Sequence, residues 1–392
     1  MPPTTPSPHD PPQEFQEFRC LDGKGPPLKA HPSNHDRNWM SPNIDDGPTA
    51  HNEFGSFTYY DATHPIQIDT TSLNRFQLGN VELSLILVRR VDHKPFYRYL
   101  GHGLSKASSY SMSKFIAATA AAARMREATQ GKLGLDGFVV THTGNIPIGD
   151  LITAFCYYDE SHVKSNGVAN WFRTVSTRAR GHQLVRDVGT QLGFADDDFA
   201  WHFTAEAPPF GGDFRAADGS AHHLELDSAA PLHSNMLHTM TSAEILKRLV
   251  MFRENPETRF DHVLWEDIQV LLYGAPASLW YPDPNRLHGM CADTATYIQQ
   301  AFYELPIGND QFPTVAERAN GEWRIFSKMG FDTGHFVHTG YACFPVYQAG
   351  AIRPGWGKEF FISGRVNAQD GDEILAEAYR KVIVDIENGR LA

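Results

Sequence analysis

The sequence predicts an α+β fold in which one antiparallel sheet is assembled from both ends of the chain and flanked by helices. Strand-like apolar segments occur near the start at 81–88 and 94–100, and near the end at 323–328, 335–347 and 359–364. The long stretch between these two groups carries mainly helical patterns. Strands from both ends with helices between them are typical of α+β domains.

The length and composition are compatible with one large folded domain. The chain has 392 residues, of which 41% are hydrophobic, enough for a sizeable core. Residues 1–50 are rich in Pro, His, Asp and Asn and show little periodicity, so we expect an extended, partly disordered arm. Residues 51–392 are expected to form the folded part, with a helical subdomain at about 115–300 inserted into the sheet domain.

The charge and the cysteine pattern exclude several classes of partner. A net charge of −12 argues against binding to nucleic acid or to anionic membranes. Four scattered cysteines without a Cys-x-x-Cys pair suggest neither a disulfide framework nor a zinc site. No apolar stretch is long enough to span a membrane, and the N-terminus does not resemble a signal peptide. We therefore expect a cytoplasmic protein, unless a leader has been removed.

The individual elements follow from local patterns. The apolar strand 81–88 and its partner 94–100 are joined by a polar turn and predict a hairpin. An Ala-rich helix is expected from Ser111 to about 128, with Gly131 as its stop. Further expected elements are helices at 148–158, 168–172, 182–192, 245–252, 260–273, 293–302 and 372–388, and a hairpin at 214–226 with an Asp-Gly turn.

The segment Ser111-Met112-Ser113-Lys114 is the strongest candidate for a catalytic turn. Residues three apart lie on one face of a helical turn, so the lysine can approach the Ser111 hydroxyl. A buried lysine near other cations loses its proton readily, and a neutral lysine can accept the serine proton. The helix N-terminus would add amide donors for an oxyanion. Ser161-His162-Val163-Lys164 has the same spacing but lies in a polar stretch, which makes it the weaker match.

The order of motifs resembles that of the penicillin-recognising serine enzymes, which include class A β-lactamases and the transpeptidase domains of penicillin-binding proteins. These families carry Ser-x-x-Lys, Ser-x-Asn and Lys-Thr-Gly. The first motif matches Ser111 and Lys114, and the third is best matched by Lys328-Met329-Gly330 at the end of a strand. His338-Thr339-Gly340 is a competing match one strand later. The resemblance implies that 51–392 is a β-lactamase-like catalytic domain.

The second motif has three candidate registers. Ser165-Asn166-Gly167 resembles Ser-Asp-Asn, with glycine in place of the amide side chain. Lys164-Ser165-Asn166 would put a lysine where the family has serine. Tyr158 is the third candidate.

The resemblance also implies roles for these residues. Ser111 would form an acyl-enzyme with an amide, β-lactam or ester, and Lys114 would accept its proton. Ser165 would pass a proton to the leaving group, and Lys328 would orient a substrate carboxylate. The substrate-binding positions implied are Asn166, Gly330 and Asp332. A small-molecule substrate is expected, with no cofactor and no metal.

The base for deacylation is less clearly matched. Class A enzymes use a loop glutamate to activate water, and 226–231 resembles the end of that loop. In this register His223 falls at the position of the glutamate, and Glu225 is two residues along. If neither acts, the acyl-enzyme would be long-lived, as in penicillin-binding proteins.

Two other functional readings remain open from the sequence. One is a penicillin-binding-type peptidase, and the other is a catalytically silent relative that binds a ligand in the same cleft. Ser111 would then be a helix cap with Lys114 in solvent. The adjacent pair His222 and His223 would point to opposite faces of a strand, which is unsuitable for shared metal binding. Trp280 and Tyr281 are read as part of a packed loop.

Overall fold

The computed structural model describes most of the chain beyond the N-terminal arm. The described residues are 53–54, 57–91, 94–158, 160–199, 203, 206–227, 235–282, 287–293, 297–298, 301, 324–344, 347–348, 351–352, 358–387 and 390–391. The expected arm at 1–50 and most of the expected helix at 293–302 lie outside these residues.

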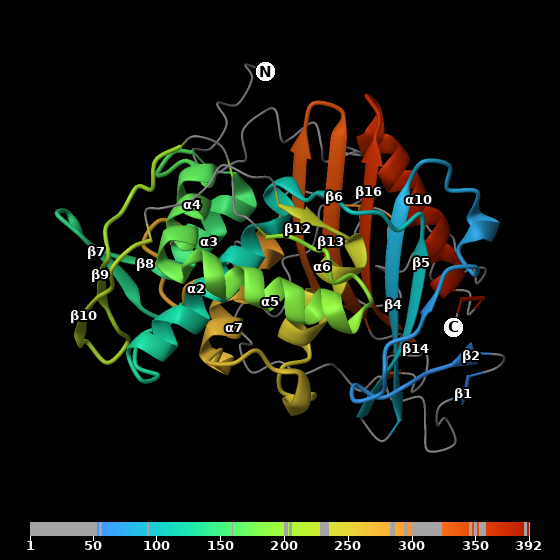
Figure 1. Ribbon diagram of the computed structural model, residues 1–392, viewed down its shortest axis with the longest axis horizontal. Helices are drawn as coiled ribbons and strands as arrows, with labels where there is room; N and C mark the ends of the chain where they lie inside the picture. Colours follow the sequence, from blue (N-terminus) through green and yellow to red (C-terminus); the bar gives the residue numbers. More distant parts are fainter. Residues whose placement is uncertain are drawn as a thin grey trace.

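The long strands lie near both ends of the chain with mainly helices between them, which is the order expected for an α+β chain (Figure 1). The strands are β1 (Glu53–Phe54), β2 (Phe57–Thr58), β3 (Ile68–Asp69), β4 (Glu82–Val91), β5 (Lys94–His102), β6 (Ala107–Ser108), β7 (Phe138–Thr141), β8 (Gly144–Pro147), β9 (Asp213–Arg215), β10 (Ala221–His223), β11 (Met236–Leu237), β12 (Arg324–Asp332), β13 (His335–Phe344), β14 (Tyr347–Gln348), β15 (Ala351–Ile352) and β16 (Lys358–Asn367). The helices are α2 (Lys114–Ala128), α3 (Ile148–Tyr157), α4 (Ser165–Ser176), α5 (Arg178–Gln191), α6 (Thr239–Val250), α7 (Trp265–Tyr273) and α10 (Gly371–Glu387). The 3₁₀ turns are η1 (Asn74–Phe76), η2 (Tyr110–Ser113), η3 (Pro256–Thr258) and η4 (Gly289–Ala292).

The main sheet joins the two ends of the chain. Its strand order is β12-β13-β16-β4-β5-β3, and the neighbours pair antiparallel except β3 with β5. The pairing of β16 with β4 brings the C-terminal strands beside the N-terminal hairpin. Every residue of β4 is buried, because helices cover both faces of the sheet: α10 packs on one face and α6 on the other. Among the described strands, β12 forms one edge.

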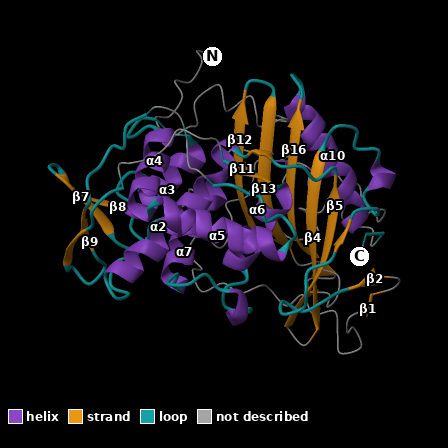
Figure 2. Ribbon diagram, in the orientation of Figure 1, coloured by secondary structure: helices purple, strands orange, loops and turns teal. Residues whose placement is uncertain are grey.

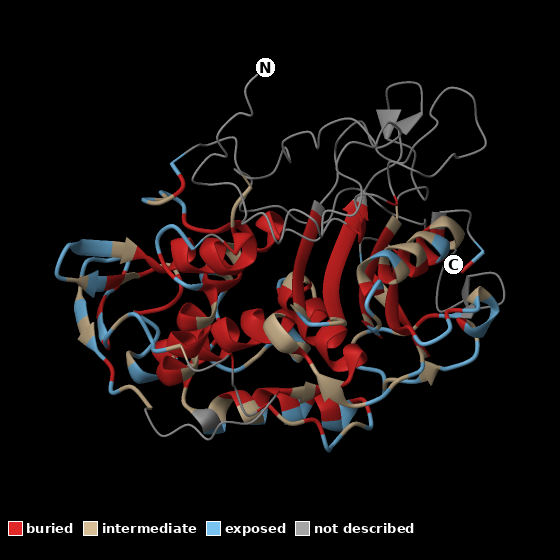
Figure 3. Ribbon diagram, turned by 90° about the horizontal axis from the view of Figure 1, so that it is seen from above, coloured by how far each residue is buried: buried red, intermediate tan, exposed pale blue. Residues whose placement is uncertain are grey.

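The second part of the molecule is a group of helices beside this sheet (Figure 2). The helix α2 lies in its interior, and its alanines 117, 118 and 120–123 are almost fully buried. Small side chains allow α4 to pack closely along it. A small sheet, ordered β10-β9-β7-β8, closes the end of the molecule farthest from the main sheet, and most of its residues are exposed or partly buried (Figure 3).

The structure confirms the predicted α+β class and most element positions. The hairpin of β4 and β5, the hairpin of β9 and β10 with its Asp218-Gly219 turn, and the terminal helix lie where the patterns place them. The helix expected to begin at Ser111 begins at Lys114 instead. Residues 110–113 form a 3₁₀ turn in which Ser113 Oγ donates a 2.9 Å bond to the Tyr110 carbonyl. Strand β12 packs against this turn, which fixes its tight conformation.

Asp267 accepts hydrogen bonds from three separate segments of the helical part. Its side chain is 1% exposed and accepts bonds from Arg126 Nε at 3.0 Å, from the Leu135 amide at 2.8 Å and from the Leu264 amide at 3.0 Å. We expect Asp267→Asn to lower the free energy of unfolding by about 3 kcal/mol, because it leaves the buried guanidinium without this counter-charge. Urea unfolding checks this value.

A matched control for that experiment is Glu377→Gln. Glu377 pairs with Arg380, but its side chain is 44% exposed. Water screens such a pair, so the change in unfolding free energy is expected to stay within about 0.5 kcal/mol. Equal stability of the Asp267→Asn variant and the unaltered protein would contradict the expectation.

Candidate active site

Two lysines and a tyrosine from three different elements meet at the edge of the main sheet. Lys114 is the first residue of α2, Lys328 lies on β12, and Tyr158 is the residue that ends α3. Both lysines are 0% exposed and Tyr158 is 4% exposed. The tyrosine ring lies close to both ammonium groups, with its centroid 4.0 Å from Lys328 Nζ and 5.3 Å from Lys114 Nζ.

The Tyr158 hydroxyl connects Lys328 with Ser111. Lys328 Nζ donates a 2.8 Å bond to Tyr158 Oη, which in turn donates a 2.7 Å bond to the Met329 carbonyl. Burial raises the pKa of Tyr158 above its ordinary value, while the charge of Lys328 and a hydrogen bond from the Ser111 hydroxyl oppose that rise. Ser111 is partly exposed in the 3₁₀ turn η2, so it can meet a ligand from solvent.

Ser165 is placed against the other lysine. It is 3% exposed at the start of α4, and its Oγ accepts a 2.7 Å bond from Lys114 Nζ. The hydrogen bond shown for Lys114 therefore goes to Ser165, whereas the Ser111 hydroxyl bonds to Tyr158. Asn166 follows Ser165 on the first turn of α4 and is half-buried. The two candidate hydroxyls of the second motif thus flank different lysines.

The pKa values of the two lysines shift in opposite directions. Burial lowers the pKa of Lys114 well below its usual range, and the positive charge of Lys328 lowers it further. Burial also acts to lower the pKa of Lys328, but Tyr158 and Asp293 outweigh it, and the pKa of Lys328 is raised. The arrangement favours a neutral Lys114 beside a charged Lys328.

The backbone beside Ser111 is suited to holding an oxyanion. A Cβ at Gly330 would lie 2.7 Å from the Ser111 amide nitrogen and 2.4 Å from that of Met112, so the close approach of β12 to the turn requires glycine. The Met329 amide donates to Asp293 and its carbonyl accepts from Tyr158, so the backbone groups of Met329 point away from β13. Alternate residues of an antiparallel strand point the same way, so those of Phe331 do as well. The amides of Ser111 and Phe331 are the candidate oxyanion donors.

A buried carboxylate, Asp293, follows η4 and lies on the edge of β12. Its Oδ2 accepts a 3.0 Å bond from Ser327 Oγ, and its Oδ1 is 3.5 Å from Lys328 Nζ. The Met329 amide also donates to it. Sequence reasoning missed this residue, because a single aspartate at the start of an expected helix reads as a helix cap.

A second carboxylate, Glu206, was also missed. Its negative charge acts on Lys114 and opposes the lowering of the pKa of that lysine. The Gly167 amide donates a 3.0 Å bond to Glu206 Oε2, and Asn170 Nδ2 donates a 2.8 Å bond to the Glu206 carbonyl. The start of α4 therefore fixes Glu206 beside the Lys114–Ser165 pair. No spacing in the sequence links Glu206 to the start of α4, because these partners lie 36 or more residues away in the chain.

The two residues weighed as deacylating base lie elsewhere. His223 ends β10 and Glu225 lies two residues beyond it, in the small sheet at the left end of Figure 1, where the helices separate it from β12. Their side chains are 60% and 94% exposed, and His223 pairs with Asp213 at 2.7 Å. The structure does not bring them to the two lysines.

The remaining sequence candidates lie outside the group formed by Lys114, Lys328 and Tyr158. Asp332 is exposed at the end of β12. Burial raises the pKa of Tyr110, and the charge of Asp332 raises it further. Ser161 and Lys164, the weaker Ser-x-x-Lys match, are both exposed in the loop before α4. Thr339 is buried opposite Lys328 on β13, so the competing His-Thr-Gly match occupies the neighbouring strand.

One group of described residues has the composition of a metal site. Ligand atoms of Asp196, Asp197 and His238 lie within 4.8 Å of one another. However, Asp197 Oδ1 already accepts bonds from the backbone amide and Nδ1 of His238, and its Oδ2 accepts one from Thr241. These contacts are those of a buried cap at the start of α6.

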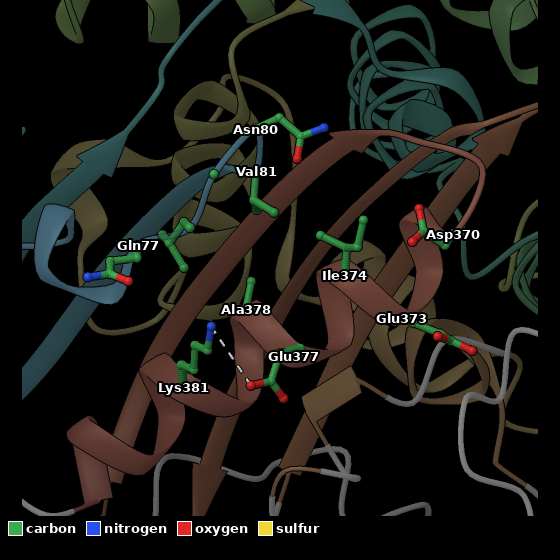
Figure 4. Close-up of a pocket in the computed structure, with 11 residues that line it drawn as sticks. Gln77, Asn80, Val81, Asp370, Glu373, Ile374, Glu377, Ala378 and Lys381 are labelled. Atoms are coloured by element: carbon green, nitrogen blue, oxygen red, sulfur yellow. Dashed lines mark ion pairs between the residues drawn. The ribbon is translucent and has the colours of Figure 1, made fainter.

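The cavity shown in Figure 4 belongs to another region. It has a volume of about 390 Å³ and lies between the segment 77–81 and α10, on the far side of the main sheet. Acidic side chains of Asp370, Glu373 and Glu377 line it, together with Lys381. None of the site residues named above contributes to it.

Comparisons with known proteins concern the structure alone. No protein-family model and no curated protein sequence matches the chain, and among the described residues no helix is long and apolar enough to cross a membrane. The structure is similar to a β-lactamase from Xanthomonas campestris, at 12% identity, 81% of this chain, 94% of that chain and a TM-score of 0.43. A β-lactamase from Burkholderia vietnamiensis shares 13% identity over 81% of this chain and 93% of its own, with a TM-score of 0.42. A class A β-lactamase of the last common ancestor of Gram-negative bacteria shares 14% over 79% and 95%, also at 0.42.

Proposed function

We propose that the protein is a serine hydrolase or acyltransferase that forms an acyl-enzyme at Ser111 on an amide, β-lactam or ester. The observation that carries this proposal is the pair of buried lysines around Tyr158, with the Ser111 hydroxyl bonded to the same tyrosine. A nucleophilic serine needs a nearby base, and a buried neutral lysine supplies one.

In the acylation step, the Ser111 hydroxyl attacks the substrate carbonyl and Lys114, in its neutral form, accepts the proton. The amides of Ser111 and Phe331 hold the oxyanion that forms on the carbonyl oxygen. One such donor typically contributes about 10²–10³ in rate. The charge of Lys328 keeps the site positive, which favours the developing negative charge.

Collapse of the tetrahedral intermediate needs a proton for the leaving nitrogen or oxygen. Tyr158 is the better placed of the two second-motif hydroxyls, because it bonds both to Ser111 and to the charged Lys328. Its proton passes to the leaving group while Lys328 stabilises the phenolate that remains. Lys114 then gives the proton that it took from Ser111 to the Tyr158 phenolate, which restores the neutral lysine and the tyrosine hydroxyl. Ser165 serves to hold Lys114 in place.

Glu206 is the candidate base for deacylation. It is half-buried beside Lys114, and its position is fixed by backbone bonds to the start of α4. In that position it would take a proton from the water that attacks the acyl-enzyme. A penicillin-binding-type peptidase, the alternative reading, would keep a stable acyl-enzyme whether or not Glu206 is present.

The first prediction concerns the nucleophile. Incubation with a fluorescent penicillin or with 4-nitrophenyl acetate is expected to add one acyl group to the protein, and Ser111→Ala is expected to abolish the adduct. Intact mass and peptide mapping measure it. Ser161→Ala, which alters the exposed Ser-x-x-Lys match, should leave labelling unchanged. Labelling that persists in Ser111→Ala would rule out this nucleophile.

The second prediction separates Tyr158 from Ser165. Tyr158→Phe is expected to slow acylation by about 10²–10⁴-fold, as expected when a positioned proton donor is removed. Ser165→Ala removes one hydrogen bond to Lys114 and is expected to cost about tenfold. Single-turnover acylation rates provide the measurement. A larger loss in Ser165→Ala than in Tyr158→Phe would return the proton-shuttle role to Ser165.

The third prediction concerns turnover. Glu206→Gln is expected to leave acylation within about threefold and to lengthen the acyl-enzyme lifetime by about 10²-fold or more, because the water then lacks its base. Adduct decay followed by mass spectrometry checks this. Glu225→Gln, a change at an exposed glutamate, is the matched control. An unchanged lifetime in Glu206→Gln would favour the peptidase reading.

A further inference from the structure

Asp293 holds the strand segment that carries Lys328 at three consecutive residues. Ser327 donates a side-chain bond of 3.0 Å to one carboxylate oxygen, Lys328 Nζ lies 3.5 Å from the other, and the Met329 amide also donates to the group. The Asp293 side chain is 1% exposed. Burying a carboxylate so deeply costs free energy unless neighbouring groups pair with its charge and donate hydrogen bonds to it.

The Lys328 ammonium is equally enclosed. It is 0% exposed. Its Nζ lies 2.8 Å from Tyr158 Oη and 2.9 Å from the Met329 carbonyl oxygen, and Asp293 is its third acceptor. Of these acceptors, Asp293 is the anionic one. A buried ammonium without a counter-ion costs several kcal/mol and tends to lose its proton.

His338 does not take over this role. Its Nε2 is 3.9 Å from Asp293, and its Nδ1 is within 3.0 Å of the Tyr379 hydroxyl. Burial, followed by the charge of Lys328, lowers the pKa of His338 to about 3, so the imidazole is neutral at physiological pH. The negative charge of Asp293 is therefore balanced by Lys328 rather than by His338.

We propose that Asp293 is a positioning residue that keeps Lys328 charged and directed at Tyr158, and that through Lys328 it keeps Lys114 in the neutral form that accepts the Ser111 proton. This inference rests on the proposed acyl-enzyme chemistry at Ser111. Asp293 itself touches the strand and the lysine, and acts on the reaction through them.

The charged groups around the two lysines define the expected direction of the effect. Tyr158, Asp293 and Cys156 act to raise the pKa of Lys328, against burial. Lys114 faces Lys328, Glu206, Cys156 and Glu160, and among these Lys328 lowers the pKa of Lys114. If Lys328 loses its proton, that lowering disappears and the pKa of Lys114 rises. The base then becomes available only at higher pH.

The test is the pH dependence of acylation in Asp293→Asn. The second-order rate of labelling by a fluorescent penicillin and by 4-nitrophenyl acetate is measured from about pH 5 to about pH 10, a range that brackets the titration of a perturbed lysine. We expect a loss of about tenfold or more at neutral pH, corresponding to a rise of about one unit in the pKa of the base. The loss should shrink by about threefold or more near the alkaline end of the range, as Lys114 is again deprotonated.

Two further variants separate this effect from general damage. Asp267→Asn alters a buried carboxylate in the helical part, and the acid limb of its pH profile should stay in place even though its stability falls. Lys328→Arg supplies a cation that does not lose its proton. When Asp293→Asn is added to Lys328→Arg, the acid limb should move by less than half of the shift that Asp293→Asn causes alone.

The outcomes are distinct. A loss in Asp293→Asn that is the same at every pH, or no loss, would overturn the positioning role while leaving the nucleophile intact. An equal shift in the protein that already carries Lys328→Arg would also overturn it. Labelling that survives Ser111→Ala would instead refute the proposed function, and the inference would fall with it.

Discussion

The arrangement depends on the repulsion between two lysines enclosed at the edge of one sheet. Lys114 and Lys328 are both fully buried, and two ammonium ions in such a site cannot both be stable without counter-charges. Lys328 contacts a carboxylate and a tyrosine hydroxyl, whereas Lys114 donates to a neutral hydroxyl and has the charge of Glu206 nearby. The asymmetry of these partners favours a charged Lys328 beside a neutral Lys114.

The fold supplies this asymmetry through long-range packing. Lys114 comes from a central helix whose alanines let α4 approach closely, which brings Ser165 against the lysine. Lys328 comes from a strand that reaches the helices only because the sheet is completed by both chain ends. The site therefore depends on the junction between the two halves, and no single element contains it.

The parts of this arrangement that arise from neighbours in the sequence were predictable. The α+β class follows from apolar strands at both ends. The spacing of three puts Ser111 and Lys114 close in the chain, but the turn between them is 3₁₀ and the hydrogen bond of Lys114 goes to Ser165. Tyr158 appeared only as one of three registers, since the loop after α3 separates it from Ser165 by seven positions. Glu206 and Asp293 leave no local pattern, because their partners lie 36 or more and 34 or more residues away in the chain. Their roles depend on which segments the folded chain brings together.

The position of Asp293 beside β12 also bears on whether a strand of another chain could pair with this edge. An edge strand offers unpaired backbone groups on which a strand of another chain can be templated. Here the Met329 amide donates to Asp293, and the Met329 carbonyl accepts from both Tyr158 and Lys328. The middle of the edge is thus closed by side chains, and a foreign strand would have to displace two buried charges to pair with it. The contacts that hold Lys328 therefore also occupy the backbone groups at the middle of this edge.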